Sequence, residues 1–155
     1  SAVAMAQLLA LYHDPRREIP TQADARGGYE VVRIIERLPG PVLVPDHGYL
    51  QQLAGKPTNA AGMALYDVLR GEDPRIRAEL MEELRQAIRS GRYQAVILDE
   101  RGVMTPWVQD EVEKHCELKG DIFQGEPVFW PVTGHNMRPR SVWVLRGEPE
   151  NKGPR

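Results

Sequence analysis

The chain has 155 residues, about the length of one domain, and can bury roughly two-thirds of its unfolded surface without disulfides or metals. Its 20 basic and 22 acidic residues give a formal net charge of −2. No run of like charge would follow a phosphate backbone, so we expect no nucleic acid partner. The single cysteine, Cys116, excludes an internal disulfide framework and a multi-cysteine zinc site.

The N-terminal segment, residues 2–12, is apolar except for Gln7. Eleven residues are too few to span a bilayer, which takes about 20 apolar residues in a helix. The segment also lacks the basic leader of a complete signal peptide. We therefore expect residues 1–13 to be either the continuation of a membrane helix or an ordinary N-terminal helix.

Residues 14–147 are expected to form a single α/β domain, followed by a disordered polar tail at residues 148–155. The clearest helix starts are Thr21, with Asp24 three residues later, and Asp73, followed by Pro74. Apolar residues at helical spacing complete the pattern. Together these signals predict helices near residues 21–38, 49–53, 63–69, 73–90 and 106–115.

Two short apolar runs, residues 42–44 and 95–98, are typical of buried strands. The helices between them make a crossover unit, for which a parallel, right-handed connection is expected. Residues 128–132 and 141–145 alternate in polarity and predict two later strands. The fold class predicted is therefore α/β, a Rossmann-like three-layer sandwich with a small, mainly parallel sheet.

Polar side chains follow both buried strands: Asp46 and His47 after the first, Asp99 and Glu100 after the second. Ligands in open α/β sheets gather beyond the carboxyl ends of strands. Asp46 and His47 can form an acid/base pair, and with Asp99 and Glu100 they can bind a divalent cation. The alternative is structural: Asp46 caps the next helix, His47 bonds to backbone, and the two later carboxylates are ordinary turn residues.

The turn at Lys56 has the sequence GKPT, which differs from a nucleotide-binding loop. That motif has a glycine, four intervening residues and then a Gly-Lys pair, with a hydroxyl residue after the lysine, where this chain has Pro57. A dinucleotide fingerprint is also missing from the sequence. No cofactor is expected.

Aromatic side chains offer a second type of site. Stacking on tryptophan and phenylalanine rings can bind a carbohydrate or a peptide, although strand aromatics mostly complete a core. The residues open to either interpretation are Trp107, Phe129, Trp130 and Trp143. His115 and Cys116 are neighbours on a helix and face different directions, so a thiol nucleophile is not indicated.

Several of these segments resemble the C-terminal region of bacterial polytopic glycosyltransferases of the dolichyl-phosphate-mannose protein mannosyltransferase-like superfamily. The similarity covers most of residues 14–146. It rests on VLVPDHGYL (42–50), LAGKPT (53–58), MALYD (63–67), AVILDE (95–100), FWPVTG (129–134), RPR (138–140) and VWV (142–144).

The resemblance implies an accessory domain at the extracytoplasmic, periplasmic face of the bacterial inner membrane. Such enzymes take sugars from polyprenyl-phosphate donors, and their catalytic carboxylate lies in an early loop between membrane helices, so no catalytic residue carries over to this chain. The implied partners are the transmembrane portion of the same protein and a polyprenyl-phosphate sugar or a glycan acceptor. Asp46, His47, Tyr49 and Lys56 are the residues expected to bind sugar or lipid phosphate.

A second interpretation belongs to another class of protein. The chain can be an independent small α/β enzyme, a hydrolase or a metal-binding enzyme, that uses Asp46, His47 and Asp99. In that case the strand-end residues perform the chemistry themselves.

Overall fold

The computed structural model describes residues 2–59 and 62–147, so the tail expected at residues 148–155 lies outside the described residues. All five predicted helices are present. The elements in chain order are α1 (Ala2–Ala10), η1 (Pro15–Glu18), α2 (Gln22–Arg37), β1 (Val42–Leu43), α3 (Gly48–Leu53), α4 (Gly62–Arg70), α5 (Pro74–Arg89), β2 (Ala95–Glu100), α6 (Thr105–His115), β3 (Cys116–Asp121) and β4 (Arg138–Leu145).

The predicted caps explain where two of the helices begin. Thr21 caps α2, and its side chain and that of Asp24 bind each other's backbone amides in a capping box. The Asp73 side chain accepts a hydrogen bond from the Arg75 amide at the start of α5, with Pro74 in the first turn. Local sequence thus determines both helix starts.

The sheet is mixed rather than mainly parallel, which corrects the sequence-based expectation. Its order is β1-β2-β4-β3. The pairing of β1 with β2 is parallel, as predicted, but β4 runs antiparallel to both β2 and β3. The reason is the connection between β3 and β4, which returns the chain beside β2 without a crossover helix.

The prediction of a strand at residues 128–132 is wrong, because the chain there has no regular structure. Phe129 has a positive φ of 61°, which interrupts an extended backbone, and Pro131 lacks an amide to donate. The edge strand beside β4 is instead β3, which has a polar sequence with Gly120. The sequence does not predict this strand, because polar edge strands show little alternation of apolar and polar residues. Only its pairing with β4 identifies it.

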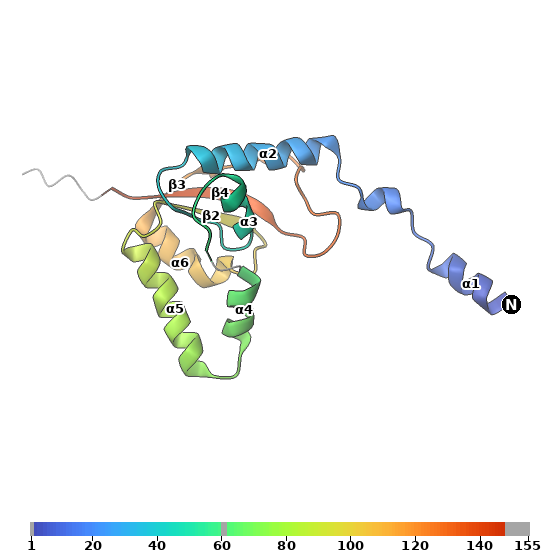
Figure 1. The fold of residues 1–155 in the computed structure, drawn as a ribbon, viewed down its shortest axis with the longest axis horizontal. Coiled ribbons are helices and arrows are strands. Elements are labelled where there is room, and N and C mark those ends of the chain that lie inside the picture. The colour runs from blue at the N-terminus through green and yellow to red at the C-terminus, as the bar shows by residue number, and fades with distance from the viewer. Residues whose placement is uncertain (1, 60–61, 148–155) are drawn as a thin grey trace, which may run out of the picture.

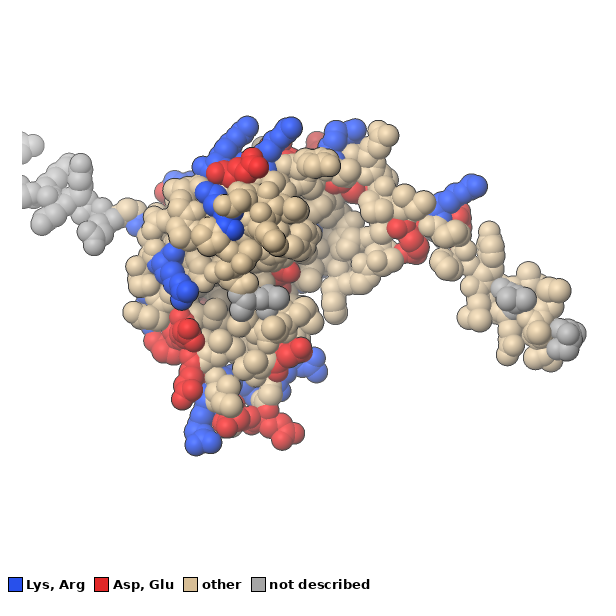
Figure 2. Space-filling model, in the orientation of Figure 1, with Lys and Arg blue, Asp and Glu red and all other residues tan. Residues whose placement is uncertain are grey.

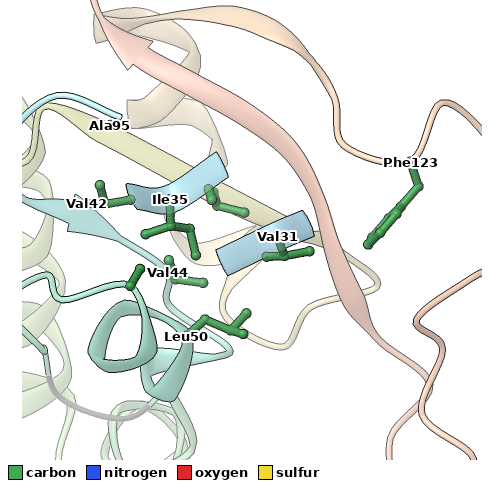
Figure 3. Packing of buried hydrophobic residues seen from close by; sticks show 9 residues of the cluster. Val31, Ile35, Val42, Val44, Leu50, Ala95 and Phe123 are labelled. Carbon is green, nitrogen blue, oxygen red and sulfur yellow. The ribbon is translucent and has the colours of Figure 1, made fainter. Parts of the chain in front are cut away.

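The core lies on both faces of β2, where successive side chains point in opposite directions. Figure 3 shows Val31 and Ile35 of α2 facing Val42, Val44, Ala95 and Leu50 on one side. On the other side, Val96 and Leu98 pack with residues of α5 and α6. This alternation makes β2 the centre of the fold.

The N-terminal helix α1 lies away from the sheet and is joined to α2 through η1 (Figure 1). Its side chains are apolar apart from Gln7, and Val3, Met5 and Leu9 are each more than 60% exposed. Within residues 2–59 and 62–147, none of the helices has the length and apolar character needed to cross a membrane.

Candidate functional site

The parallel pairing of β1 and β2 brings the predicted strand-end residues together. Val42 pairs with Ala95 and Leu43 with Val96, so both strands end at the same edge of the sheet. The residues just after β1 therefore meet the last residues of β2, Asp99 and Glu100, although the two sets are more than 50 positions apart in the chain.

His47 and Asp99 make the closest contact at this edge. His47 Nε2 lies 2.6 Å from Asp99 Oδ2. The Asp99 side chain is fully buried, and the His47 side chain is 15% exposed. The separation is that of a hydrogen bond, but the contact is not aligned as one, and both atoms are buried without an aligned partner. Burial raises the pKa of the Asp99 carboxyl, and the nearby imidazole offsets part of that effect.

Asp46 lies beside this pair and binds a different helix from the one expected. Its Oδ1 accepts a hydrogen bond of 3.0 Å from the backbone amide of Met104, at the start of α6. The prediction that Asp46 caps the following helix is therefore wrong; α3 has His47 at its N-cap, without a side-chain bond. Long-range packing, rather than local capping, determines where this carboxylate binds.

The pKa of Asp46 is raised from 3.8 to about 6. Burial is the main cause, and the charge of Asp99 adds to it, whereas the Met104 amide and His47 act in the opposite direction. Asp46 Oδ2 is buried without a hydrogen-bond partner. The site is therefore electrostatically costly, because an unsatisfied buried polar atom costs about 1–3 kcal/mol.

Gly102 allows the carboxylates to approach α6 closely. A Cβ atom at this position would lie 2.3 Å from Asp46 Oδ2, 2.7 Å from Asp99 Cβ and 2.7 Å from Thr105 Oγ1. The sequence-based prediction did not include this residue. A glycine three positions after a strand-end aspartate is the signal that was available, since it marks a close backbone approach.

Beside His47 there is a pocket of about 330 Å³, which we call the His47 pocket. Three segments form its wall: Asp24 from α2, His47 and Tyr49 from the turn and helix after β1, and Phe129 and Trp130 from the β3–β4 connection. The Tyr49 ring meets the His47 ring edge-on, at 5.9 Å between centres. Burial raises the pKa of the Tyr49 hydroxyl, and the charge of Asp99 contributes further. Aromatic rings from two of these segments thus form part of the wall.

A hydrogen bond holds Phe129 against α2, and Gly28 in that helix leaves space for the Phe129 ring. Its amide donates to Asp24 Oδ1 at 2.8 Å, while Asp24 Oδ2 accepts from the Thr21 amide and hydroxyl. A Cβ atom at Gly28 would lie 2.8 Å from the Phe129 ring. The capping residue and the glycine in α2 therefore both position one wall of the His47 pocket.

Trp130 is positioned by the buried Arg138, the first residue of β4. The guanidinium donates hydrogen bonds to the carbonyls of Glu126 and Val128, at 2.6 and 2.7 Å, and lies 4.4 Å from the centre of the Trp130 ring. A second guanidinium, that of Arg101, lies 5.6 Å from the same ring centre. Arg138 thus organises the connection that closes the pocket.

The structure places two predicted site residues in other surroundings. Lys56 Nζ donates to the carbonyl of Leu38 at 2.7 Å, which ties the α3–α4 turn to the end of α2. Glu100 faces Arg138, with 3.5 Å between Glu100 Oε2 and the guanidinium. Within the described part of the chain, no group of three or more His, Cys, Asp or Glu residues has an arrangement that could hold a metal ion.

The four aromatic candidates divide into two groups. Phe129 and Trp130 line the His47 pocket. Trp107 and Trp143 pack against the core on the α5–α6 side, and Trp143 Nε1 donates to Ser141 Oγ at 2.9 Å. The comparisons with protein-family models, with curated proteins and with solved structures find no match to this chain.

Replacing Gly102 with alanine is expected to destabilise the fold by about 1–3 kcal/mol, because the added methyl group overpacks the space between Asp46 and Asp99. Gly102 does not have a positive φ, so the effect is steric rather than a backbone penalty. Urea unfolding measures the change. Gly147→Ala is the matched control, since a Cβ atom there meets nothing within 4 Å. Equal stability of the two variants would contradict the close approach at Gly102.

Stability is expected to depend on the protonation of Asp46. Because the folded-state pKa is raised, the proton favours the fold; this contribution is complete below pH 3.8 and is lost as the pH rises through about 6. As the pH rises from about 4 to 6, the natural chain should therefore lose stability relative to Asp46→Asn. Above that range the difference in stability between the two proteins should be constant. Urea unfolding at several pH values measures the difference.

Asp46→Ala is the comparison for this experiment. It also lacks the titrating group, but it leaves the Met104 amide without its acceptor and should be less stable than Asp46→Asn throughout. A difference between Asp46→Asn and the natural chain that stays constant from pH 4 to 8 would rule out a buried, titrating Asp46.

Proposed function

We propose that this chain is the extracytoplasmic accessory domain of a bacterial polytopic membrane glycosyltransferase that uses a polyprenyl-phosphate sugar donor. In this proposal the domain is not itself catalytic. The His47 pocket recognises the acceptor or the donor, and the transmembrane portion of the same protein is the partner, at the periplasmic face of the inner membrane.

One observation carries the proposal. The segments VLVPDHGYL and FWPVTG, which provide much of the resemblance to these enzymes, lie about 80 residues apart in the chain. Both contribute to the His47 pocket, the first through His47 and Tyr49, the second through Phe129 and Trp130. Ligand sites in proteins are typically concave and lined by aromatic side chains with a few polar groups. A shared recognition site accounts for the convergence of the two segments.

The arrangement of the elements supports the finer description of the fold as a Rossmann-like three-layer sandwich. The parallel β1–β2 pair is joined through helices, and separate core clusters lie against α2 and α3 on one side and α5 and α6 on the other. The exposed apolar surface of α1 supports its interpretation as the continuation of a membrane helix.

The test of this function uses the whole protein encoded by the gene. We expect hydrophobic spans upstream of Ser1 in the reading frame, and sugar transfer from a polyprenyl-phosphate donor in membranes that contain the protein. Tyr49→Ala should raise the KM for one substrate about tenfold with little change in kcat, because a recognition residue binds ground state and transition state alike.

Ile76→Ala on α5 is the matched control, since Ile76 is about as exposed as Tyr49, 52% against 55%, and should leave transfer unchanged. A reading frame without membrane spans, or a membrane protein without transferase activity, would overturn the proposal.

The contact between His47 and Asp99 favours a second candidate, a hydrolase. A buried carboxylate beside an imidazole can orient the ring as a general base for an attacking water. In this case the purified chain hydrolyses a p-nitrophenyl ester, phosphate or glycoside. His47→Gln should lower the rate at least a hundredfold while unfolding at the same urea concentration. Absence of turnover with all three substrates would eliminate this candidate.

A further inference from the structure

The His47 pocket continues into a second hollow between α2 and α3. This hollow, of about 390 Å³, shares Ala25, Tyr49 and Phe129 with the pocket and is extended by Tyr29 and Leu53. We call the two together the aromatic groove. Tyr29 is 70% exposed and, of these two hollows, lines only the second. One ligand can therefore occupy both parts, with Tyr49 and Phe129 at their junction.

The charge of the aromatic groove restricts its ligand. Among the described residues that line it there is no lysine or arginine; the ionisable groups are Asp24, His47 and the two tyrosines. Behind His47 lie the carboxyls of Asp46 and Asp99. A phosphate group, which proteins bind with cations or clustered amides, meets acidic groups here instead.

Two cations beside the Trp130 ring are engaged by other groups. Arg138 is 5% exposed and bonds to two backbone carbonyls, and Arg101 lies over the Trp130 ring. Figure 2 agrees with this distribution: basic and acidic side chains project along α2 and around α4 and α5, while the surface between α2 and α3 is mostly uncharged. The groove thus has aromatic faces and hydroxyl groups, and its described lining residues include no lysine or arginine.

We propose that the aromatic groove binds an uncharged glycan of at least two sugar units, with one unit in the His47 pocket and the next against Tyr29. The flat apolar faces of sugar rings can pack on Tyr29, Tyr49 and Phe129, and sugar hydroxyls can bond to the tyrosine hydroxyls and His47. The inference rests on the proposed function for its role: an uncharged ligand is the acceptor, and the phosphate-bearing donor binds elsewhere in the whole protein.

The test is a calorimetric titration of the purified chain with defined sugars. The probes are mannose, glucose and N-acetylglucosamine, the corresponding trisaccharides, and mannose 1-phosphate as the anionic counterpart. We expect at least one trisaccharide to bind about tenfold more tightly than its monosaccharide, since an aromatic contact is gained in the second hollow. Mannose 1-phosphate should bind more weakly than mannose.

Two variants locate the subsites. Tyr29→Ala should remove the trisaccharide's advantage and leave the monosaccharide affinity unchanged, whereas His47→Ala should weaken both about tenfold. Tyr12→Ala is the control, because Tyr12 is 78% exposed and is not part of the groove lining. Far-ultraviolet circular dichroism and the unfolding midpoint verify that each variant is folded.

Three results would overturn this inference: tighter binding of mannose 1-phosphate than of mannose, equal affinity for one and three units, or no saturable binding of any neutral sugar. These outcomes are separable from failure of the proposed function, which is decided by the reading frame and by transfer in membranes. A whole protein that transfers sugar while its isolated domain binds none would refute the glycan groove alone.

Discussion

The parallel pairing of β1 with β2 is the constraint on which the rest of the structure depends. It places the ends of two buried strands side by side, so that the turn carrying Asp46 and His47 meets Asp99. The core on both faces of β2 supports this pairing. A shift in register would move every β2 side chain to the other face and separate the polar cluster.

The polar cluster is not explained by stability alone. Asp46 Oδ2 and both Asp99 oxygens are buried without an aligned hydrogen-bond partner, and burial raises the pKa of each carboxyl. Apolar side chains of similar shape would often cost less at such positions. Strained and poorly satisfied groups gather at functional sites, and here they stand directly behind the histidine that lines the pocket.

The pocket itself depends on the irregular connection between β3 and β4. Arg138 and Asp24 bind the backbone of this connection, and Gly28 leaves space for the Phe129 ring. Residues near positions 24, 47 and 130 thus form one wall although they are far apart in the chain. The described lining of the groove has no basic side chains, which favours an uncharged ligand over a phosphate-bearing one.

Sequence by itself determined the five helices, the starts of α2 and α5, the two buried strands and the strand-end position of Asp46, His47 and Asp99, because periodicity and capping act over a few residues. Only the tertiary structure decided the antiparallel position of β4, the pairing of β3, the bond from Met104 to Asp46 and the separate surroundings of Lys56 and Glu100. These features result from contacts between distant segments, and neither local propensity nor spacing in the chain encodes which partners will meet.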